Sequence, residues 1–289
     1  MKHPDPSNDP RPPEGFQFIE KLASGGMGVV FRAKDIKLDR EVAIKFLKSK
    51  YSIIPDLVRR FERETRLTGK LQHPGVPPIH RDGCLDDGRP YLVMKLIKGS
   101  TLQQMLAKNE KLDTLAVFES IAQTVGYAHT EHVIHRDLKP LNVMVGTFSE
   151  VQVMDWGLAK MLQEPASGEA LDPDPYADTL KQELSSADPS DLTKPGAMLG
   201  TVPYMSPEQA NADLQKINQR SDLFGLGAIL CAMLTGRPPY SEGDVLKNVR
   251  AGNTKEAFRR IDKSKVDRRV KALCKRCLAL KPEDRYSDR

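Results

Sequence analysis

The run LFGLGAILCAML, residues 223–234, carries no charged side chain. A helix that is apolar on every side has to be buried, and this run is shorter than the about 20 residues that span a membrane. It therefore predicts a helix enclosed by a larger, mainly helical body of protein. Ser221 before the run and Gly236 after it are typical of helix ends, and we expect them to cap this helix.

The first part of the chain has a strand-like pattern instead. Residues 16–47 contain the segments FQFIEKL, VVFRAK and VAIKFL, separated by turn residues, which favours an antiparallel meander. A helix is predicted from Pro55 onward, because apolar residues then recur at helical spacing, and its inward face includes the carboxylate of Glu64. Two more strand-like segments follow, at residues 76–80 and 89–97.

Together these patterns predict an α+β chain with two lobes. Residues 14–97 are expected to form a small lobe, an antiparallel five-strand sheet with one helix, and residues 98–289 a larger, mainly helical lobe. Residues 1–13 are polar and rich in proline, which indicates a disordered tail. Residues 163–195 hold 8 acidic residues, 2 lysines and 5 prolines, which indicates a disordered insertion in the larger lobe.

Composition excludes several classes of protein. No apolar run is long enough to span a membrane, and the N-terminus lacks the apolar middle of a signal peptide, so we expect a cytoplasmic protein without a membrane segment. The cysteines are too few for a disulfide framework, and CKRC at 274–277 lacks the second pair of a zinc site, so we assign it to core packing. The basic residues of 255–289 alternate as on a helix surface, so nucleic-acid binding is not predicted.

A glycine-rich turn and a lone lysine are the first candidates for a binding site. LASGGMGVVF, residues 22–31, lets main-chain N–H groups approach phosphates closely, although a plain hairpin is the commoner explanation of such a turn. Lys45 stands alone in the apolar strand VAIKF. It either lies at a sheet edge facing water or pairs with Glu64 and holds the α- and β-phosphates of a nucleotide.

The tripeptide His-Arg-Asp occurs twice, at residues 80–82 and 135–137. The first copy falls between two predicted strands and is followed by Gly83 and a turn-rich segment without a lysine or asparagine partner. We therefore expect its three residues at a strand end and in a turn. The second copy stands in VIHRDLKPLN, directly before the apolar segment VMV.

The residues around the second copy suit phosphoryl transfer. Asp137 can orient an attacking hydroxyl and accept its proton, and Lys139 can neutralise charge on the transferred phosphoryl group. Asn142 on the same loop, and Asp155 in VMDWG farther along the chain, can ligate a magnesium ion. At most one of the two copies can supply the catalytic base, and only Asp137 has these partners.

With these motifs in order, the chain resembles the eukaryotic-like serine/threonine protein kinases of bacteria from about residue 16 to residue 285. The shared motifs are the glycine-rich loop, VAIK, the helix glutamate, HRDLKPLN, DWG, GTVPYMSPEQ and SDLFGLG. The resemblance implies a bilobal protein-kinase-like fold, ATP and Mg²⁺ as cofactors, and transfer of the γ-phosphoryl group to serine or threonine hydroxyls of protein substrates, including the protein itself. The alternative is a pseudokinase that binds ATP without turnover, and the oligomeric state is left open.

The resemblance also assigns an ATP site. The residues implied are Leu22, Ala23, Ser24, Gly25, Gly26, Met27, Gly28, Val29, Val30, Ala43, Lys45, Glu64, Met94, Lys95, Ile97 and Met144. In this set Met94 occupies the gatekeeper position, and main-chain groups of Lys95 and Ile97 are implied to bind the adenine edge. Ala23 replaces the first glycine of the usual loop, so we expect weaker ATP binding, by about 1 kcal/mol, if the backbone there needs a glycine-only conformation.

Several residues of the larger lobe receive supporting roles from the resemblance. Asp222 is implied to hold the backbone of the catalytic loop, and Arg285 to pair with Glu208. Thr201 together with the catalytic-loop lysine is similar to the serine/threonine branch of the family. Arg136, directly before the base, implies regulation by a phosphate on the activation segment.

The activation segment departs most from the family pattern. It runs from Asp155 to Glu208 and includes the acidic insertion, in which Thr193 is our first candidate phosphorylation site, before Ser190, Ser185 and Ser186. Trp156 replaces the usual phenylalanine, and the smaller Thr68 is expected to compensate for its volume. Finally, the chain ends at Arg289, before the last helix expected for the family.

Overall fold

The computed structural model describes residues 9–162 and 201–287. The chain divides into two compact units, one formed by residues 1–72 and 77–98, the other by residues 73–76 and 99–289. Part of the predicted tail is placed in the first unit, because Asp9 pairs with Lys21 at 2.8 Å and Pro10 and Pro13 are buried.

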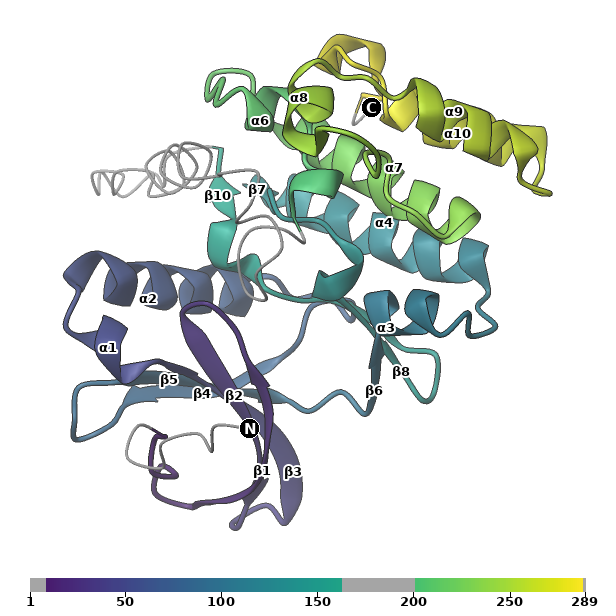
Figure 1. The fold of residues 1–289 in the computed structure, drawn as a ribbon. Coiled ribbons are helices and arrows are strands. Elements are labelled where there is room, and N and C mark those ends of the chain that lie inside the picture. The colour runs from purple at the N-terminus through teal and green to yellow at the C-terminus, as the bar shows by residue number, and fades with distance from the viewer. Residues whose placement is uncertain (1–8, 163–200, 288–289) are drawn as a thin grey trace. The chain divides into compact units, whose positions relative to one another are not determined.

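The first unit contains one five-stranded antiparallel sheet (Figure 1). Its strands are β1 Phe16–Ser24, β2 Gly28–Asp35, β3 Arg40–Leu47, β4 Ile79–Cys84 and β5 Pro90–Lys95, in the spatial order β1-β2-β3-β5-β4. Alternate residues of β2 and β3 are apolar and point into one buried cluster. Phe31, Phe46, Tyr91 and Val93 belong to it, and the ring of Phe18 stacks on that of Phe31. The predicted five-strand sheet is confirmed.

Two helices accompany this sheet. The predicted helix is α2, Pro55–Lys70, which begins with Pro55 in its first turn and lies against β4 and β5. Its buried face includes Phe61 and, as expected, Glu64. The short helix α1, Ser49–Ser52, precedes it and was not predicted.

The first His-Arg-Asp copy lies inside a strand, not at a strand end and in a turn as expected from the sequence. Residues 80–82 belong to β4, where Arg81 and Asp82 pair with Val93 and Leu92 of β5. The turn comes later, around Gly88, whose φ is +82°. The predicted strand at residues 76–80 starts only at Ile79, because the two prolines before it cannot donate ladder hydrogen bonds.

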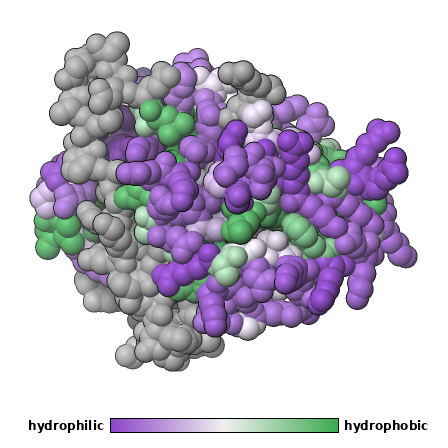
Figure 2. Space-filling model, turned by 90° about the horizontal axis from the view of Figure 1, so that it is seen from above, coloured by the Kyte–Doolittle hydropathy of each residue, from purple (hydrophilic) through white to green (hydrophobic). Residues whose placement is uncertain are grey.

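Within residues 73–76, 99–162 and 201–287, the second unit is mainly helical and has two small sheets. Its helices are α3 Leu102–Ala107, α4 Thr114–Thr130, α6 Pro207–Ala210, α7 Gln219–Thr235, α8 Val245–Arg250, α9 Lys255–Lys263 and α10 Arg268–Cys277. Its strands are β6 Gly99–Thr101, β7 Val133–Ile134, β8 Val143–Gly146, β9 Val151–Val153 and β10 Lys160–Met161, paired as β6-β8-β9 and β10-β7. Figure 2 views this unit from the side of α8, α9 and α10, where hydrophilic residues predominate and hydrophobic ones form small separate patches.

Helix α7 is the predicted buried helix. It contacts α4, α9 and α10, and a side chain at Gly227 would meet Cys277 at 2.6 Å, so the close packing there requires glycine. Gly236 ends the helix with φ +72°, as expected. The start was predicted wrongly: Asn218 is the N-cap, and Ser221 is the third helical residue, whose hydroxyl accepts from the main chain of Asn218.

The remaining features of this unit fit the composition. Cys274 and Cys277 are buried in the core, which confirms core packing for CKRC. No helix that the structure describes has the length and apolar character needed to cross a membrane.

Candidate active site

The glycine-rich turn joins β1 and β2. Leu22, Ala23 and Ser24 lie on β1, Gly25, Gly26 and Met27 in the turn, and Gly28, Val29 and Val30 on β2. The turn is closed by a hydrogen bond from the Gly25 N–H to the Gly28 carbonyl at 3.0 Å, and the N–H of Lys48 donates to Met27 at 2.9 Å. A side chain at Gly28 would lie 3.3 Å from the carbonyl oxygen of Phe46, so the turn folds back closely on β3.

The backbone at Ala23 does not need a glycine. Ala23 is part of β1, pairs with Val30 and has no positive φ. The added methyl group therefore causes no backbone strain, and the condition for weaker ATP binding is not met.

Lys45 and Glu64 form an ion pair. The lysine Nζ lies 2.5 Å from Glu64 Oε1, and the two side chains are 20% and 10% exposed. Because β3 is flanked by β2 and β5, Lys45 cannot be an edge-strand lysine, and that interpretation is wrong. Lys45 lies close to the glycine-rich turn, because a side chain at Gly28 would lie 3.4 Å from its Cε.

The residues implied for adenine binding are divided between the units. Ala43, Met94 and Ile97 of the first unit are buried, while Leu22 is half exposed, and Met144 lies on β8 of the second unit. The Lys95 N–H donates to the carbonyl of Pro78 at 3.0 Å. Of the two main-chain groups of Lys95, only the carbonyl could therefore bind a nucleotide base.

The backbone of the second His-Arg-Asp copy is held by Asp222, as the resemblance implies. Asp222 Oδ2 accepts from the N–H of His135 at 2.7 Å, and Oδ1 accepts from the N–H of Arg136 at 2.8 Å. His129 Nε2 lies 2.9 Å from the same carboxylate. Burial opposes ionisation of Asp222, but the contacts with His129 and His135 outweigh it and hold the pKa of Asp222 below its usual range.

Asp137 lies at the centre of a set of polar contacts. Lys139 Nζ donates to its two carboxylate oxygens at 3.0 and 2.8 Å, and also to Thr201 Oγ1 at 2.6 Å. Asn142 Nδ2 donates to the Asp137 carbonyl and to Oδ2, both at 2.9 Å. The structure thus brings together the catalytic-loop residues that the sequence singled out.

The two candidate magnesium ligands, Asn142 and Asp155, lie in the second unit. Asn142 uses its Nδ2 as a donor, so its Oδ1 is the atom with which it could ligate a cation. Asp155 has φ +60° and ψ +71°, and the preceding residue, Met154, donates its N–H to the Asn142 carbonyl at 2.7 Å. Within residues 9–162 and 201–287, no three His, Cys, Asp or Glu side chains could hold a metal alone. One carboxylate and one amide suit Mg²⁺, which completes its shell with water and phosphate oxygens.

Trp156 is fully buried beside the catalytic loop. Its ring lies 4.6 Å from that of His135, and its Nε1 donates to the Val153 carbonyl at 3.1 Å. A tryptophan fits here because its N–H has a partner. The predicted volume exchange with Thr68, which belongs to the other unit, stays a prediction.

The end of the activation segment is anchored by a buried ion pair. Arg285 donates to the two carboxylate oxygens of Glu208 at 2.6 and 2.9 Å, and Ser221 donates to Glu208 at 2.8 Å. Burial alone would raise the pKa of Glu208, but Arg285 holds it below the usual range. Thr193, Ser190, Ser185 and Ser186, and with them the predicted insertion, lie outside the described residues.

Comparison with known proteins identifies the family of this chain. A family model described as protein kinase domain matches residues 16–289. The chain belongs to the protein kinase family. Serine/threonine-protein kinase PknD of Protochlamydia amoebophila is 34% identical over 289 residues, covering 94% of this chain and 28% of that protein. PrkC of Bacillus subtilis is 33% identical over 228 residues, covering 78% of this chain and 31% of the relative.

A third relative, PknB of Mycobacterium leprae, is 31% identical over 281 residues, covering 94% of this chain and 40% of the relative. All three are named serine/threonine-protein kinases. The chain thus spans well under half the length of these relatives.

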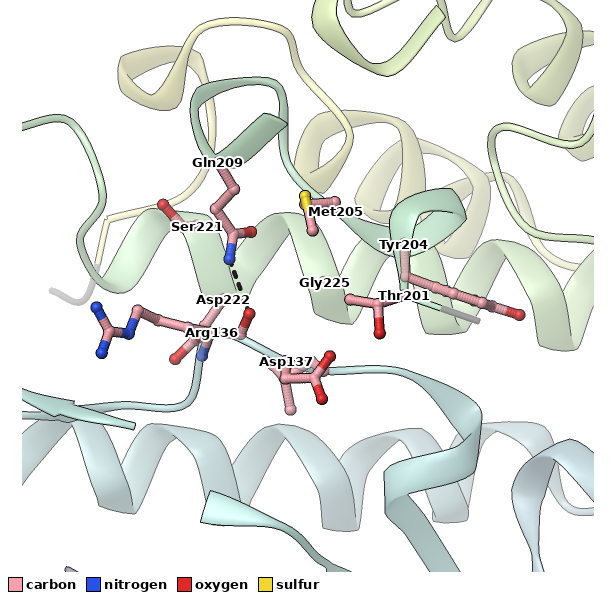
Figure 3. Close-up of a pocket in the computed structure, with 10 residues that line it drawn as sticks. Arg136, Asp137, Thr201, Tyr204, Met205, Gln209, Ser221, Asp222 and Gly225 are labelled. Atoms are coloured by element: carbon pink, nitrogen blue, oxygen red, sulfur yellow. Dashed lines mark hydrogen bonds between the residues drawn. The ribbon is translucent and has the colours of Figure 1, made fainter. Parts of the chain in front are cut away.

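One residue of the kinase site was missed by sequence reasoning. Gln209 follows Glu208 on α6, and its Nε2 donates to the carbonyl of Arg136 at 2.7 Å (Figure 3). With Arg136, Asp137 and Thr201 it lines a cavity of about 10 Å³, large enough for a single water molecule. The Ser-Pro-Glu-Gln spacing could have predicted that Gln209 caps α6, but not that it reaches the catalytic loop.

Proposed function

We propose that this kinase domain transfers the γ-phosphoryl group of ATP to serine or threonine hydroxyls of proteins, its own chain included. The observation that carries this proposal is the arrangement around Asp137, whose carboxylate is buried and contacted by Lys139 and Asn142. A loop built this way positions a hydroxyl and receives its proton.

Each group has a defined part in the reaction. The substrate oxygen forms a bond to the γ-phosphorus while the bond from that phosphorus to the β,γ-bridging oxygen breaks, and ADP leaves. Asp137 orients the hydroxyl and takes its proton. Lys139 sits within 3.0 Å of the Asp137 carboxylate and so offers its charge to the transferred phosphoryl group.

We also propose ATP and Mg²⁺ as the cofactors. Lys45, paired with Glu64, would bind the α- and β-phosphates, and the glycine-rich turn would cover them. Asn142 and Asp155 would hold Mg²⁺, which supplies charge neutralisation on the phosphate oxygens when bound. Because ATP is the proposed substrate, we place the reaction in the cytoplasm, where the sequence led us to expect the protein.

The choice of serine and threonine rests on the loop itself and on the relatives. Lys139 donates to Thr201 at 2.6 Å, a contact that places the lysine between the base and the segment before α6. The named relatives are serine/threonine kinases, which supports the same substrate class.

Labelled ATP tests this function. The kinase domain is incubated with Mg²⁺ and a generic basic protein, and the phosphorylated residues are identified by mass spectrometry. We expect label on serine and threonine with the wild type and almost none with Asp137→Ala. Equal labelling by the two proteins, or no labelling by either, would contradict the proposal.

A further inference from the structure

Gln209 is a buried side chain whose amide makes two kinds of contact. It is 4% exposed. Its Oε1 accepts from the main-chain N–H of Ser206 at 3.2 Å and from the Ser206 hydroxyl at 2.9 Å, which forms the capping box of α6. Its Nε2 points the other way and donates to Arg136 at 2.7 Å, as the dashed line in Figure 3 shows.

The peptide groups of Arg136 are therefore held from two helices. Its N–H is bound by Asp222 of α7 at 2.8 Å, and its carbonyl by Gln209 of α6 at 2.7 Å. Arg136 has φ +67°, in the left-handed region that a long side chain rarely adopts. Such a conformation persists only where the surroundings determine it, and these two contacts do so.

The carbonyl that Gln209 holds belongs to the peptide bond directly before the base. A rotation of this peptide plane would change the direction in which the Asp137 side chain leaves the backbone. Lys139 and Asn142 contact the Asp137 carboxylate itself, at 2.8 and 2.9 Å. Gln209 adds a contact to the main chain directly before Asp137.

We propose that Gln209 is a positioning residue for phosphoryl transfer, linking α6 to the catalytic loop and fixing the peptide between Arg136 and Asp137. This inference rests on the proposed function. Gln209 would then influence the rate of the chemical step in addition to capping α6.

Gln209→Glu separates the two parts. A glutamate still offers a carboxylate oxygen that accepts from the N–H and the hydroxyl of Ser206, and it is a favoured residue at this position of a capping box. It cannot donate to the Arg136 carbonyl while ionised. Asn211→Asp is the matched control, because Asn211 ends the same helix but donates its amide to the carbonyls of Pro207 and Arg250, which lie outside the catalytic loop.

The measurement is steady-state kinetics with a fixed protein substrate. For Gln209→Glu we expect kcat to fall by about 10- to 100-fold, the loss typical of a misplaced reacting group, with KM for ATP within about twofold of wild type. Asn211→Asp should keep kcat within about twofold. Since a protonated glutamate can donate a hydrogen bond, kcat of Gln209→Glu relative to wild type should rise as the pH is lowered.

Gln209→Met removes the amide without adding charge and provides a second test. It should reproduce the loss of kcat but show no recovery at lower pH. Unchanged kcat in both variants, an equal loss in Asn211→Asp, or failure of both variants to fold would overturn the positioning role. If the wild type itself transfers no phosphate, the proposed function fails instead.

Discussion

The chain carries the same tripeptide in two settings, and the structure treats the two copies differently. The first copy, residues 80–82, lies on the edge strand β4 with all three side chains exposed. The second copy is buried: His135, Arg136 and Asp137 are 0%, 5% and 7% exposed. The first is strand with a register shift at His80 and no positive φ, whereas the second contains a left-handed residue held by α6 and α7.

The difference shows that a catalytic loop requires more than the three residues of the tripeptide. An aspartate on an exposed strand is fully hydrated, and its orientation changes freely. Asp137 has fixed neighbours on both sides, so its direction toward a substrate hydroxyl is set before substrate arrives. Preorganised polar groups of this kind give enzymes much of their rate.

Asp222→Ala should have the largest effect on the stability of the region around the second copy. The substitution leaves the N–H groups of His135 and Arg136 buried without their acceptor, so we expect the free energy of unfolding to fall by about 3–5 kcal/mol. Urea unfolding followed by the fluorescence of Trp156, the only tryptophan, measures this loss beside the catalytic loop. As a control, Asp244→Ala removes an exposed helix cap and should cost about 1 kcal/mol. Equal losses would contradict the account.

Replacing the histidine of each copy tests the comparison directly. His135→Ala removes a ring that contacts Trp156, receives the N–H of Asp137 and lies 3.0 Å from the Met154 carbonyl, so we expect about 2–3 kcal/mol of destabilisation. His80→Ala changes an exposed strand residue and should stay within about 0.5 kcal/mol. Thermal melts of the two variants, run in parallel, check both values. A similar loss of stability at the two positions would contradict the difference between the two copies.

Lowering the pH should weaken the contacts that Asp222 and Glu208 make around the second copy. The pKa values of Asp222 and Glu208 are held below their usual range, so their stabilisation is complete above about pH 4 and is lost as the pH falls through the lowered values. In Arg285→Met the buried Glu208 loses its cation and prefers the protonated form, so unfolding should begin at higher pH. Trp156 fluorescence against pH gives the two midpoints. A midpoint for Arg285→Met at or below that of wild type would contradict this assignment.

Much of this molecule was predictable from sequence because its signals are local. Alternating apolar residues and turn residues give the five strands, and the apolar run gives α7. Lys45 and Glu64 could be paired because a buried carboxylate on a helix face needs a cation.

What sequence reasoning missed depends on the surroundings. The extended backbone of residues 80–82 comes from pairing with β5, which overrides the turn signal of the nearby glycine. The left-handed conformation of Arg136 comes from acceptors and donors on distant elements. Gln209 shows no pattern of its own that points to the catalytic loop, since its contact spans 73 residues of sequence.

The most direct test of the account exchanges the aspartate of each copy for asparagine, one at a time. Asp137→Asn and Asp82→Asn are purified side by side, and initial rates of phosphate transfer from ATP to a protein substrate are measured. The account predicts a rate lowered by about 100-fold or more for Asp137→Asn, the usual contribution of a general base, and a rate within about twofold of wild type for Asp82→Asn. A full rate from Asp137→Asn, or an equal loss from Asp82→Asn, would contradict it.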